Sequence, residues 1–323
     1  MTAPRVSVLM PVHDTARWVE AACESILRQT LRELELVVID DGSSDDSAER
    51  LRALAARDPR VRLSCRHNLG LVATRNELLA RARAPLVAWM DSDDLSVPER
   101  LALQLTRFEA EPTLVCLGGS VLELDPDGEP LQRICYPAEH EAIAEAMTRA
   151  GAMRFPTTMM RRQAALDAGG FREPFPIGED FDLCWRLLER GRLANLQQVV
   201  LHYRLHPHSA SQRLGARWAA YRDAILELAR ERRETGSDRL QRGEGLQIAA
   251  TSSGPATDDL VECHQRFARQ ALASGYGRVA RKHARRVLAL APAKLGSWKL
   301  AARVAFDSSR QALTHWAAPR RTS

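Results

Sequence analysis

Two carboxylates that could hold a metal ion follow an apolar run, in the segment Asp91-Ser92-Asp93-Asp94. The run before them, residues 85–90, is short, apolar and partly β-branched, which predicts a buried strand. Because side chains alternate along a strand, Asp91 and Asp93 would point to the same side where that strand ends. Such a pair suits a hard cation such as Mg²⁺ or Mn²⁺, which usually binds phosphate as well. The alternative is a polar loop in which Ser96 caps the following helix.

Two more apolar runs end in polar residues. Residues 34–39 lead into Asp40-Asp41-Gly42-Ser43-Ser44, and residues 6–10 lead into Pro11-Val12-His13-Asp14. A parallel sheet binds its ligands at the carboxyl ends of its strands, so these tips are expected to lie at one edge. For Asp40-Asp41 the alternative is an ordinary turn that caps the next helix.

The elements that would position these residues alternate along the first 125 residues. Short apolar runs are separated by amphipathic stretches of helical period, which indicates right-handed βαβ units and a mostly parallel sheet. Residues 114–124 predict one or two strands broken by Gly118-Gly119, and residues 199–206 predict another strand. From residue 214 the pattern is helical. We expect an α/β domain over residues 1–212, a helix and polar linker over 213–257, and a helical hairpin region over 258–323.

Composition narrows the class of protein. Of 323 residues, 45% are hydrophobic and 27% are charged, and the formal charge of +5 permits an anionic ligand without arguing for nucleic acid. The six cysteines form no C-x-x-C pair, which disfavours a zinc site or a disulfide framework. No signal peptide and no run of 18 apolar residues is evident, so a cytoplasmic location is expected.

A basic face is predicted on the helix that follows Gly277. It is either a solvated surface or a peripheral docking face for anionic lipid, or for a lipid-linked acceptor, at the inner face of a membrane. Its members are Arg278, Arg281, Lys282, Arg285 and Arg286.

Several short motifs, in this order and spacing, resemble the inverting family 2 glycosyltransferases with the GT-A fold. The resemblance covers roughly residues 4–212. It is carried by the segments Val6–Asp14, Ser25–Thr30, Leu36–Ser43, Asn68–Gly70, Ala73–Asn76, Asp91–Asp94, Gly169–Phe171, Gly178–Leu183 and Tyr203–His206.

The resemblance implies a Rossmann-like, mostly parallel central sheet flanked by helices, here with a C-terminal helical extension. It also implies transfer of a sugar from a nucleotide-diphosphate donor, most commonly a UDP-sugar, with Mg²⁺ or Mn²⁺ as cofactor. The acceptor would be a hydroxyl group on a glycan, a lipid-linked molecule or a small molecule, in the synthesis of a bacterial surface glycan, a polysaccharide or a natural-product glycoside.

Roles for individual residues follow from the same resemblance. Asp180 would be the catalytic base, and Glu179 would contact the acceptor beside it. Asp93 would ligate the metal, and His206 would close the metal or diphosphate site. The nucleotide-sugar would be bound by Pro11, His13, Asp40, Asp41, Arg75, Asp91 and Ser92.

Alternatives remain for these assignments. Glu179-Asp180 could stabilise a helix N-terminus, and His206 could simply end a strand. A sugar nucleotidyltransferase is a rival function, but that class carries a Gly-rich basic loop where this chain has Pro11–Asp14. A non-catalytic nucleotide-sugar-binding or scaffold protein is the other rival, and the intact Asp93 and Asp180 argue against it.

Overall fold

The computed structural model describes residues 3–149, 151–207, 209, 218–246, 248 and 260–317, with side chains as far as residue 307. The chain divides into two compact units, each formed from separate segments. The first comprises Met1–Val121, Cys135–Tyr203 and Arg217–Ser252, and the second comprises Leu122–Ile134, Arg204–Ala216 and Ser253–Ser323. These units are discontinuous in sequence, whereas the expected division at residues 212 and 257 is continuous. The ends of the expected linker, 213–217 and 249–257, lie outside the described residues.

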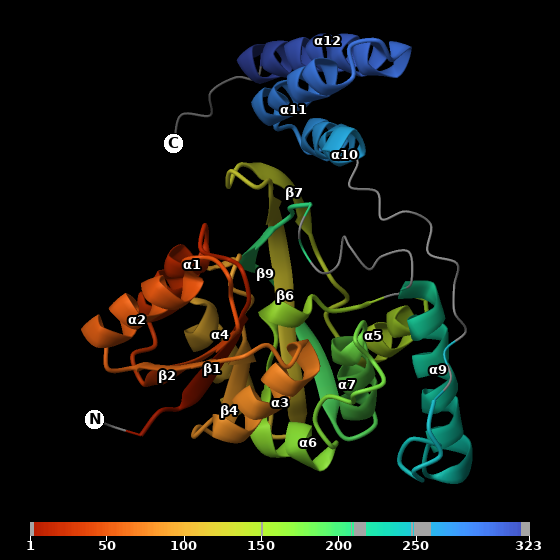
Figure 1. Ribbon diagram of the computed structural model, residues 1–323. Helices are drawn as coiled ribbons and strands as arrows, with labels where there is room; N and C mark the ends of the chain where they lie inside the picture. Colours follow the sequence, from red (N-terminus) through yellow and green to blue (C-terminus); the bar gives the residue numbers. More distant parts are fainter. Residues whose placement is uncertain are drawn as a thin grey trace. The chain divides into compact units, whose positions relative to one another are not determined.

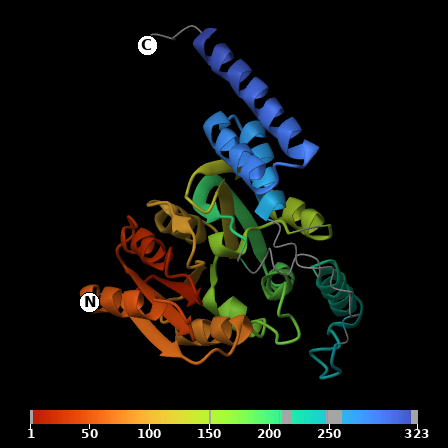
Figure 2. The ribbon, with the colours of Figure 1, turned by 45° about the horizontal axis from the view of Figure 1, so that its top comes forward.

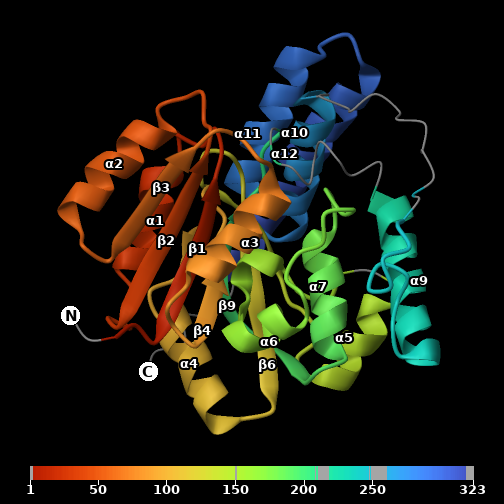
Figure 3. The same cartoon turned by 60° about the horizontal axis from the view of Figure 1, so that its bottom comes forward.

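Four parallel strands form one half of the sheet in the first unit, drawn in red to orange in Figure 1. Their order is β3-β2-β1-β4 (Figure 3). In the register of these strands, Val6 of β1 lies opposite Leu34 of β2 on one side and Leu86 of β4 on the other. At the far end of β1, Val12 lies opposite Asp40 of β2. The polar tips predicted after these strands therefore lie at one edge of the sheet. The strands are β1 (Val6–Val12), β2 (Leu34–Asp41), β3 (Val61–Arg66) and β4 (Leu86–Trp89).

The connecting helices cover both faces of these strands. From β1 to β3 the chain moves in one direction across the sheet, and it then returns past β1 to form β4. Right-handed crossovers therefore place the first two helices on one face and the third on the other. Figure 3 shows this arrangement, with α3 packed over β1 and β2. The helices are α1 (Val19–Leu27), α2 (Ser47–Arg57) and α3 (Leu71–Arg81).

The sheet continues beyond β4 with antiparallel pairings. The order is β4-β8-β6-β9-β5, in which β8 is antiparallel to both β4 and β6, and β5 is antiparallel to β9. The mostly parallel α/β fold is confirmed for the half that carries the predicted tips, and the other half makes the whole sheet mixed. These strands are β5 (Leu95–Ser96), β6 (Leu114–Leu124), β8 (Met159–Arg161) and β9 (Arg192–Arg204).

Strand β6 runs unbroken through Gly118 and Gly119. A Cβ atom on Gly118 would lie 2.3 Å from Oδ1 of Asn195, and one on Gly119 would lie 2.6 Å from Cγ2 of Val200. The two glycines therefore do not interrupt the strand. They let residues of β9 approach its backbone closely.

The remaining helices of the first unit surround this half of the sheet. The core between them contains a triad of rings, because Trp89, Phe155 and Phe171 have centroids 5.1–5.8 Å apart. A 3₁₀ turn at Phe155–Thr157 delivers the second ring. The helices are α4 (Arg100–Ala110), α5 (His140–Met147), α6 (Arg162–Asp167), α7 (Glu179–Leu188) and α9 (Trp218–Thr235).

The second unit contains three packed helices, drawn in blue in Figure 2. Helices α10 (Leu260–Ala273) and α11 (Gly277–Leu290) form the predicted hairpin, and α12 (Leu295–Ala317) packs against α11. The strand β7 (Pro130–Ile134), which pairs with β6, also contacts α10. No helix in the described ranges is long and apolar enough to cross a membrane.

Much of the basic face predicted on α11 is paired with acidic residues of the turn before β7. Lys282 Nζ contacts the carboxylates of Asp125, Asp127 and Glu129, the second at 2.8 Å. Arg278 pairs with Glu129 at 2.6 Å, and Arg286 pairs with Asp127 at 3.0 Å. Three of the five predicted cations therefore hold the turn to the helix, and the membrane contact considered above gains no support from this face.

A buried chain of polar groups runs beside these ion pairs. The Nε2 atom of His283 lies 2.9 Å from Oδ2 of Asp125, and its Nδ1 atom lies 2.9 Å from Nδ1 of His264. His283 and the Asp125 side chain are fully buried. Burial, the neighbouring His283 and the nearby cations lower the pKa of His264 to about 4. The surroundings of His264 therefore favour its neutral form.

Candidate functional site

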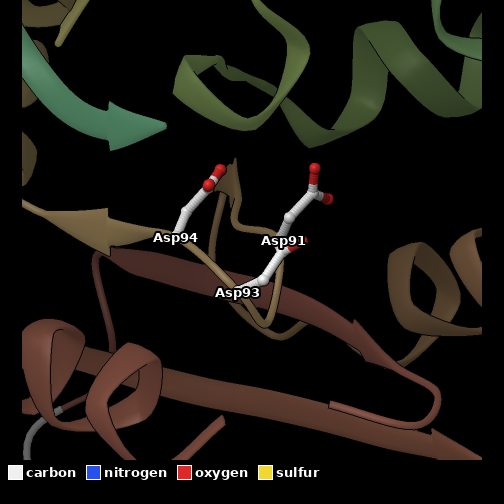
Figure 4. A group of neighbouring side chains, drawn as sticks. All are labelled: Asp91, Asp93 and Asp94. Carbon is white, nitrogen blue, oxygen red and sulfur yellow. The ribbon is translucent and has the colours of Figure 1, made fainter. Parts of the chain in front are cut away.

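Three carboxylates meet in the turn that follows β4. Oxygen atoms of Asp91, Asp93 and Asp94 all lie within 4.8 Å of one another. Figure 4 shows the side chains of Asp91 and Asp94 pointing to the same side of the turn. Oxygen-only ligands from carboxylates suit Mg²⁺ or Mn²⁺, so these residues fit the cation that the sequence predicts.

Asp94 was not among the predicted site residues. The prediction used the alternation of a strand, but β4 ends at Trp89 and the chain turns over residues 91–94. In a turn, neighbouring side chains can converge, and this brings Asp94 to the cluster although its side chain is fully buried. Its position next to Asp93 in an acidic run was the only sequence signal that could have indicated it.

Arg75 joins this turn to a second group of carboxylates. It lies on α3 and is 5% exposed. Its guanidinium forms a short ion pair with Glu179 and lies 3.8 Å from Asp91. Burial alone would lower the pKa of Arg75, but Glu179, Asp91 and Asp180 reverse the effect and raise it. The arginine therefore stays charged between the two acidic groups.

Aromatic rings surround the same guanidinium. Its Cζ atom lies 4.7 Å from the ring centroid of Phe155, 5.6 Å from that of Phe171 and 6.0 Å from that of Trp89. Ring faces attract a cation in a desolvated site. The three rings and the carboxylates together fix where the positive charge of Arg75 lies.

Helix α7 presents Glu179 and Asp180 in its first turn. The preceding Gly178 has a φ of +80°, and a Cβ atom there would lie 2.8 Å from the ring of Trp218. Glycine is required on both counts, for the left-handed backbone and for the close approach of α9. Asp180 Oδ1 accepts a hydrogen bond of 2.7 Å from the backbone N–H of Phe181.

The electrostatics place Asp180 close to both Glu179 and Asp91. Burial raises the pKa of Glu179 to about 7, an effect that Arg75 opposes and the Asp180 charge reinforces. The pKa of Asp91 rises to about 6, chiefly through loss of hydration, although a third of its side chain reaches the surface. Arg75 again opposes the rise, and Asp93 and Asp180 add to it. Like charges gathered around one cation produce this pattern, which is typical of functional sites.

A cavity of about 90 Å³ adjoins Asp180. Apart from the Asp180 carboxylate, its lining is mainly apolar and comes from the ends of α5 and α9, from α7 and from the loop before the 3₁₀ turn. The lining residues are Met147, Gly151, Ala152, Met153, Phe155, Asp180, Phe181, Cys184 and Trp218.

The predicted residues at the tip of β2 have different surroundings. Asp41 accepts hydrogen bonds from the backbone N–H groups of Leu69 (3.0 Å) and Gly70 (2.9 Å), and it pairs with Arg66 at 3.0 Å. It therefore holds the loop that starts α3. Asp40 is 3% exposed, and its Oδ1 atom has no hydrogen-bond partner among the described residues. A buried carboxylate oxygen of this kind is available to a donor group of a ligand.

The tip of β1 is shaped by Asp14, which has a φ of 52°. Its Oδ1 accepts a hydrogen bond of 2.6 Å from the backbone N–H of Ser44, which ties the tips of β1 and β2 together. Aspartate tolerates this left-handed backbone better than most residues, and its side chain, like that of asparagine, accepts hydrogen bonds from backbone N–H groups in turns. The preceding His13 has a side chain that is about half-exposed, and Pro11, near the end of β1, is partly buried.

Two further predicted residues have other surroundings. Ser92 Oγ is 2.9 Å from Thr15 Oγ1, so this buried serine links the turn after β4 to the segment after β1. His206 follows β9, is 5% exposed and belongs to the second unit. Its role at a metal or diphosphate site stays a prediction.

The structure thus brings Arg75, Asp91, Asp93, Glu179 and Asp180 to one place. Pro11, His13, Asp40 and Asp41 lie at the adjacent tips of β1 and β2. The sequence reasoning missed Asp94, the rings around Arg75 and the contribution of α9 through Trp218. Phe181 and Trp185 of α7 are both buried.

Comparison with known proteins gives the chain its family. The family described as "Glycosyl transferase family 2" matches residues 7–170. The O-antigen biosynthesis glycosyltransferase WbnJ of Escherichia coli is 28% identical over 231 residues, which cover 70% of this chain and 90% of that protein. Chondroitin synthase of Pasteurella multocida (strain Pm70) is 28% identical over 210 residues, which cover 64% of this chain and 21% of that protein. The chain thus spans only about a fifth of the synthase.

A solved structure supports the same fold. The mannosyltransferase PcManGT from Pyrobaculum calidifontis, in complex with GDP-Man and Mn²⁺, aligns over 97% of this chain and 85% of its own, with a TM-score of 0.52 and 18% identity. At that identity the likeness concerns the fold, and it confirms the GT-A architecture. The match to the family over residues 7–170 establishes that the chain belongs to glycosyltransferase family 2.

Proposed function

We propose that the chain is a metal-dependent, inverting glycosyltransferase that moves a sugar from a nucleotide-diphosphate donor to an acceptor hydroxyl. One observation carries the proposal: Arg75 contacts both Asp91, in the acidic turn after β4, and Glu179, at the start of α7. A site for the donor diphosphate and a site for a catalytic base therefore adjoin each other.

The donor would lie along the tips of β1, β2 and β4. The buried Oδ1 of Asp40, which has no hydrogen-bond partner within the part of the chain that the structure describes, offers an acceptor for an N–H or O–H group of the nucleoside. Val12 lies opposite Asp40, so Pro11 and His13 on either side of it would adjoin the nucleoside, and Asp41 shapes the loop beside it. A UDP-sugar is the donor we favour from the family resemblance, although the aligned mannosyltransferase was solved with GDP-Man.

The carboxylates of Asp91, Asp93 and Asp94 would hold a divalent cation, with Asp93 as the predicted ligand. When bound, such a cation supplies Lewis-acid neutralisation of the negative charge that builds on the leaving diphosphate. Arg75 adds a fixed positive charge on the same side. Its position is already set by the rings and carboxylates around it, so little reorganisation is needed as the reaction proceeds.

Asp180 would accept the proton of the acceptor hydroxyl. As the O–H bond breaks, the hydroxyl oxygen forms a bond to the anomeric carbon, and the bond from that carbon to the diphosphate oxygen breaks. The products are the glycoside with inverted configuration and the nucleoside diphosphate. A carboxylate is suited to this proton transfer, and no covalent intermediate is required. Glu179, with its raised pKa, would form a hydrogen bond with the acceptor or the donor sugar.

The proposal is tested by a thermal-shift screen of UDP- and GDP-sugars with and without Mn²⁺, followed by assay of nucleoside diphosphate release. A ligand that binds the folded chain raises its melting temperature by mass action. We expect Asp180→Asn to keep the shift but to lower turnover by about 10²–10⁴-fold, the usual contribution of a general base. Asp94→Asn should reduce the part of the shift that depends on Mn²⁺.

The control is Asp223→Asn, which changes an exposed aspartate on α9 whose side chain is 64% exposed. It should behave as the wild-type chain in both measurements. Unchanged turnover in Asp180→Asn would reject Asp180 as the base. If no nucleotide-sugar raised the melting temperature under either condition, the donor site itself would be refuted.

A further inference from the structure

The cavity beside Asp180 carries an inference about the acceptor, which rests on the function proposed above. Its volume is about 90 Å³, and apart from the Asp180 carboxylate its lining is made of apolar side chains, backbone and the thiol of Cys184. A ligand could enter from the surface, since Gly151 is exposed and Trp218 and Asp180 are half-buried. An apolar hollow of this size next to a reactive carboxylate favours binding of an apolar group.

The position of the cavity places it on the acceptor side of the site. In an in-line displacement, the leaving group and the incoming oxygen lie on opposite sides of the reacting carbon. Asp91 and Asp93 would serve the leaving diphosphate, while Asp180 would serve the incoming hydroxyl. A molecule that presents its hydroxyl to Asp180 therefore brings its neighbouring atoms to the cavity wall.

The part of the cavity wall formed by Trp218 is rigid, because the indole ring is tightly packed. The ring of Trp218 packs against that of Phe181, with centroids 5.3 Å apart at 70°. Gly178 permits this approach, because any side chain there would meet the indole. Another part of the lining is more adaptable, since Met147 and Met153 have flexible, polarisable side chains. One rigid aromatic wall and two methionines suit a flat or branched apolar group.

We propose that this cavity binds an apolar group, an aryl ring or a short alkyl chain, carried on the acceptor close to the hydroxyl that reacts. The cavity is smaller than the roughly 150 Å³ that encloses benzene in an engineered protein core. It therefore takes one ring entering in part, or a chain of a few carbons. A long hydrocarbon chain would exceed it.

The first test compares acceptors that differ only in this group. The release assay is run with the donor found above and with phenyl, butyl and methyl β-glycosides of glucose, galactose and N-acetylglucosamine. We expect kcat/KM for the phenyl or butyl glycoside to exceed that for the methyl glycoside by about tenfold or more, since each apolar carbon buried in a pocket contributes on this scale. The phenyl and butyl arms distinguish an aromatic from an alkyl group.

Two variants change the cavity in opposite ways. Trp218→Ala removes the rigid wall and should bring the preference for the apolar glycoside close to one. Gly151→Leu adds a side chain where a Cβ atom has room, since its nearest neighbour would be 3.9 Å away, and should remove the preference by filling the cavity. Trp298→Ala on α12, where the indole is 55% exposed, is the matched control and should keep the full preference.

A second test is independent of turnover. Benzyl alcohol is titrated into the full chain labelled with ¹³C at its methionine methyl groups, and the signals of Met147 and Met153 are assigned with Met→Leu variants. We expect those two signals to shift in the wild-type chain and in Trp298→Ala, but not in Gly151→Leu. Unshifted signals, or an acceptor preference that survives in both cavity variants, would overturn the inference. Loss of the thermal shift with every nucleotide-sugar would instead refute the donor site, so the two failures are distinguishable.

Discussion

Acidification should weaken the second unit through His264, before its carboxylates begin to titrate. The two Nδ1 atoms of His264 and His283 are 2.9 Å apart, so only one proton fits between them. His283 is bound on its other side to Asp125. Protons on both Nδ1 atoms at once would break the contact between the two rings. The experiment therefore compares how a fall in pH affects the wild-type chain and the His264→Asn variant. The asparagine amide keeps a hydrogen-bond donor near the position of Nδ1 but does not titrate.

The magnitude follows from the pKa of His264, which burial and the neighbouring cations lower from 6.5 to about 4. As the pH falls below 6.5, the unfolded chain takes up a proton that the folded chain refuses until about pH 4. Stability is therefore present above pH 6.5 and is lost between 6.5 and 4. A shift of this size corresponds to roughly 3 kcal/mol at most, and screening by solvent at this half-buried ring reduces it to about 1–2 kcal/mol.

Other groups of the cluster titrate lower. Lys282 and Arg286 lower the pKa of Asp127 to about 2, and the pKa of Asp125 is lowered as well, against the effect of burial, by His283 and Lys282. Their contributions are lost only as the pH falls below the ordinary range of aspartate. The window from pH 6.5 to 4.5 therefore reports mainly on His264.

The assay is hydrogen exchange measured by mass spectrometry on peptides from α10 and α11, corrected for intrinsic exchange rates at each pH. Between pH 7 and pH 4.5, the free energy of opening should fall by about 1–2 kcal/mol more in the wild-type chain than in His264→Asn. An equal fall in the two proteins would refute the assignment of acid sensitivity to this pair of rings. Peptides from α1 and α2, in the first unit, serve as the internal reference.

Two further predictions concern the first unit. Gly119→Ala should lower the free energy of unfolding in urea by about 1–3 kcal/mol, because the new Cβ atom would lie 2.6 Å from Cγ2 of Val200. A change below about 0.5 kcal/mol would contradict this account of β6. Asp182→Asn should lower the free energy of unfolding by about 3–5 kcal/mol in the same assay, because the buried Arg186, whose guanidinium is 2.6 Å from Asp182, loses its counter-charge. Stability close to wild type would show that neighbouring carbonyl groups such as that of Gly170 suffice to stabilise Arg186.

The parallel half of the fold could be predicted because local patterns determine it. Apolar runs of strand length alternate with stretches of helical period, and the handedness of the crossovers leaves few ways to arrange them. The antiparallel half was harder to predict. Its strand β8 has only three residues, and its pairing with β4 and β6 depends on contacts distant in sequence. The glycines of β6 were ambiguous for the same reason, since Val200 and Asn195 of β9 explain them.

The site was predicted where residue type and strand position sufficed. Asp91, Asp93 and Asp180 could be proposed from their motifs, and the structure brings Asp180 close enough to Asp91 to help raise the pKa of Asp91. The number of carboxylates in the turn, the aromatic surroundings of Arg75 and the wall formed by Trp218 could not be predicted. The carboxylates converge because the chain turns directly after β4. The rings around Arg75 and the position of Trp218 depend on the packing of α3, α7 and α9, which no local pattern encodes.

The aromatic enclosure of Arg75 has a consequence for the response of the chain to salt. Ions of the medium cannot enter a space filled by Trp89, Phe155 and Phe171, so they weaken the field of this guanidinium far less than that of a surface cation. The attraction it exerts on a bound pyrophosphate should accordingly persist at ionic strengths that abolish attraction to surface lysines and arginines.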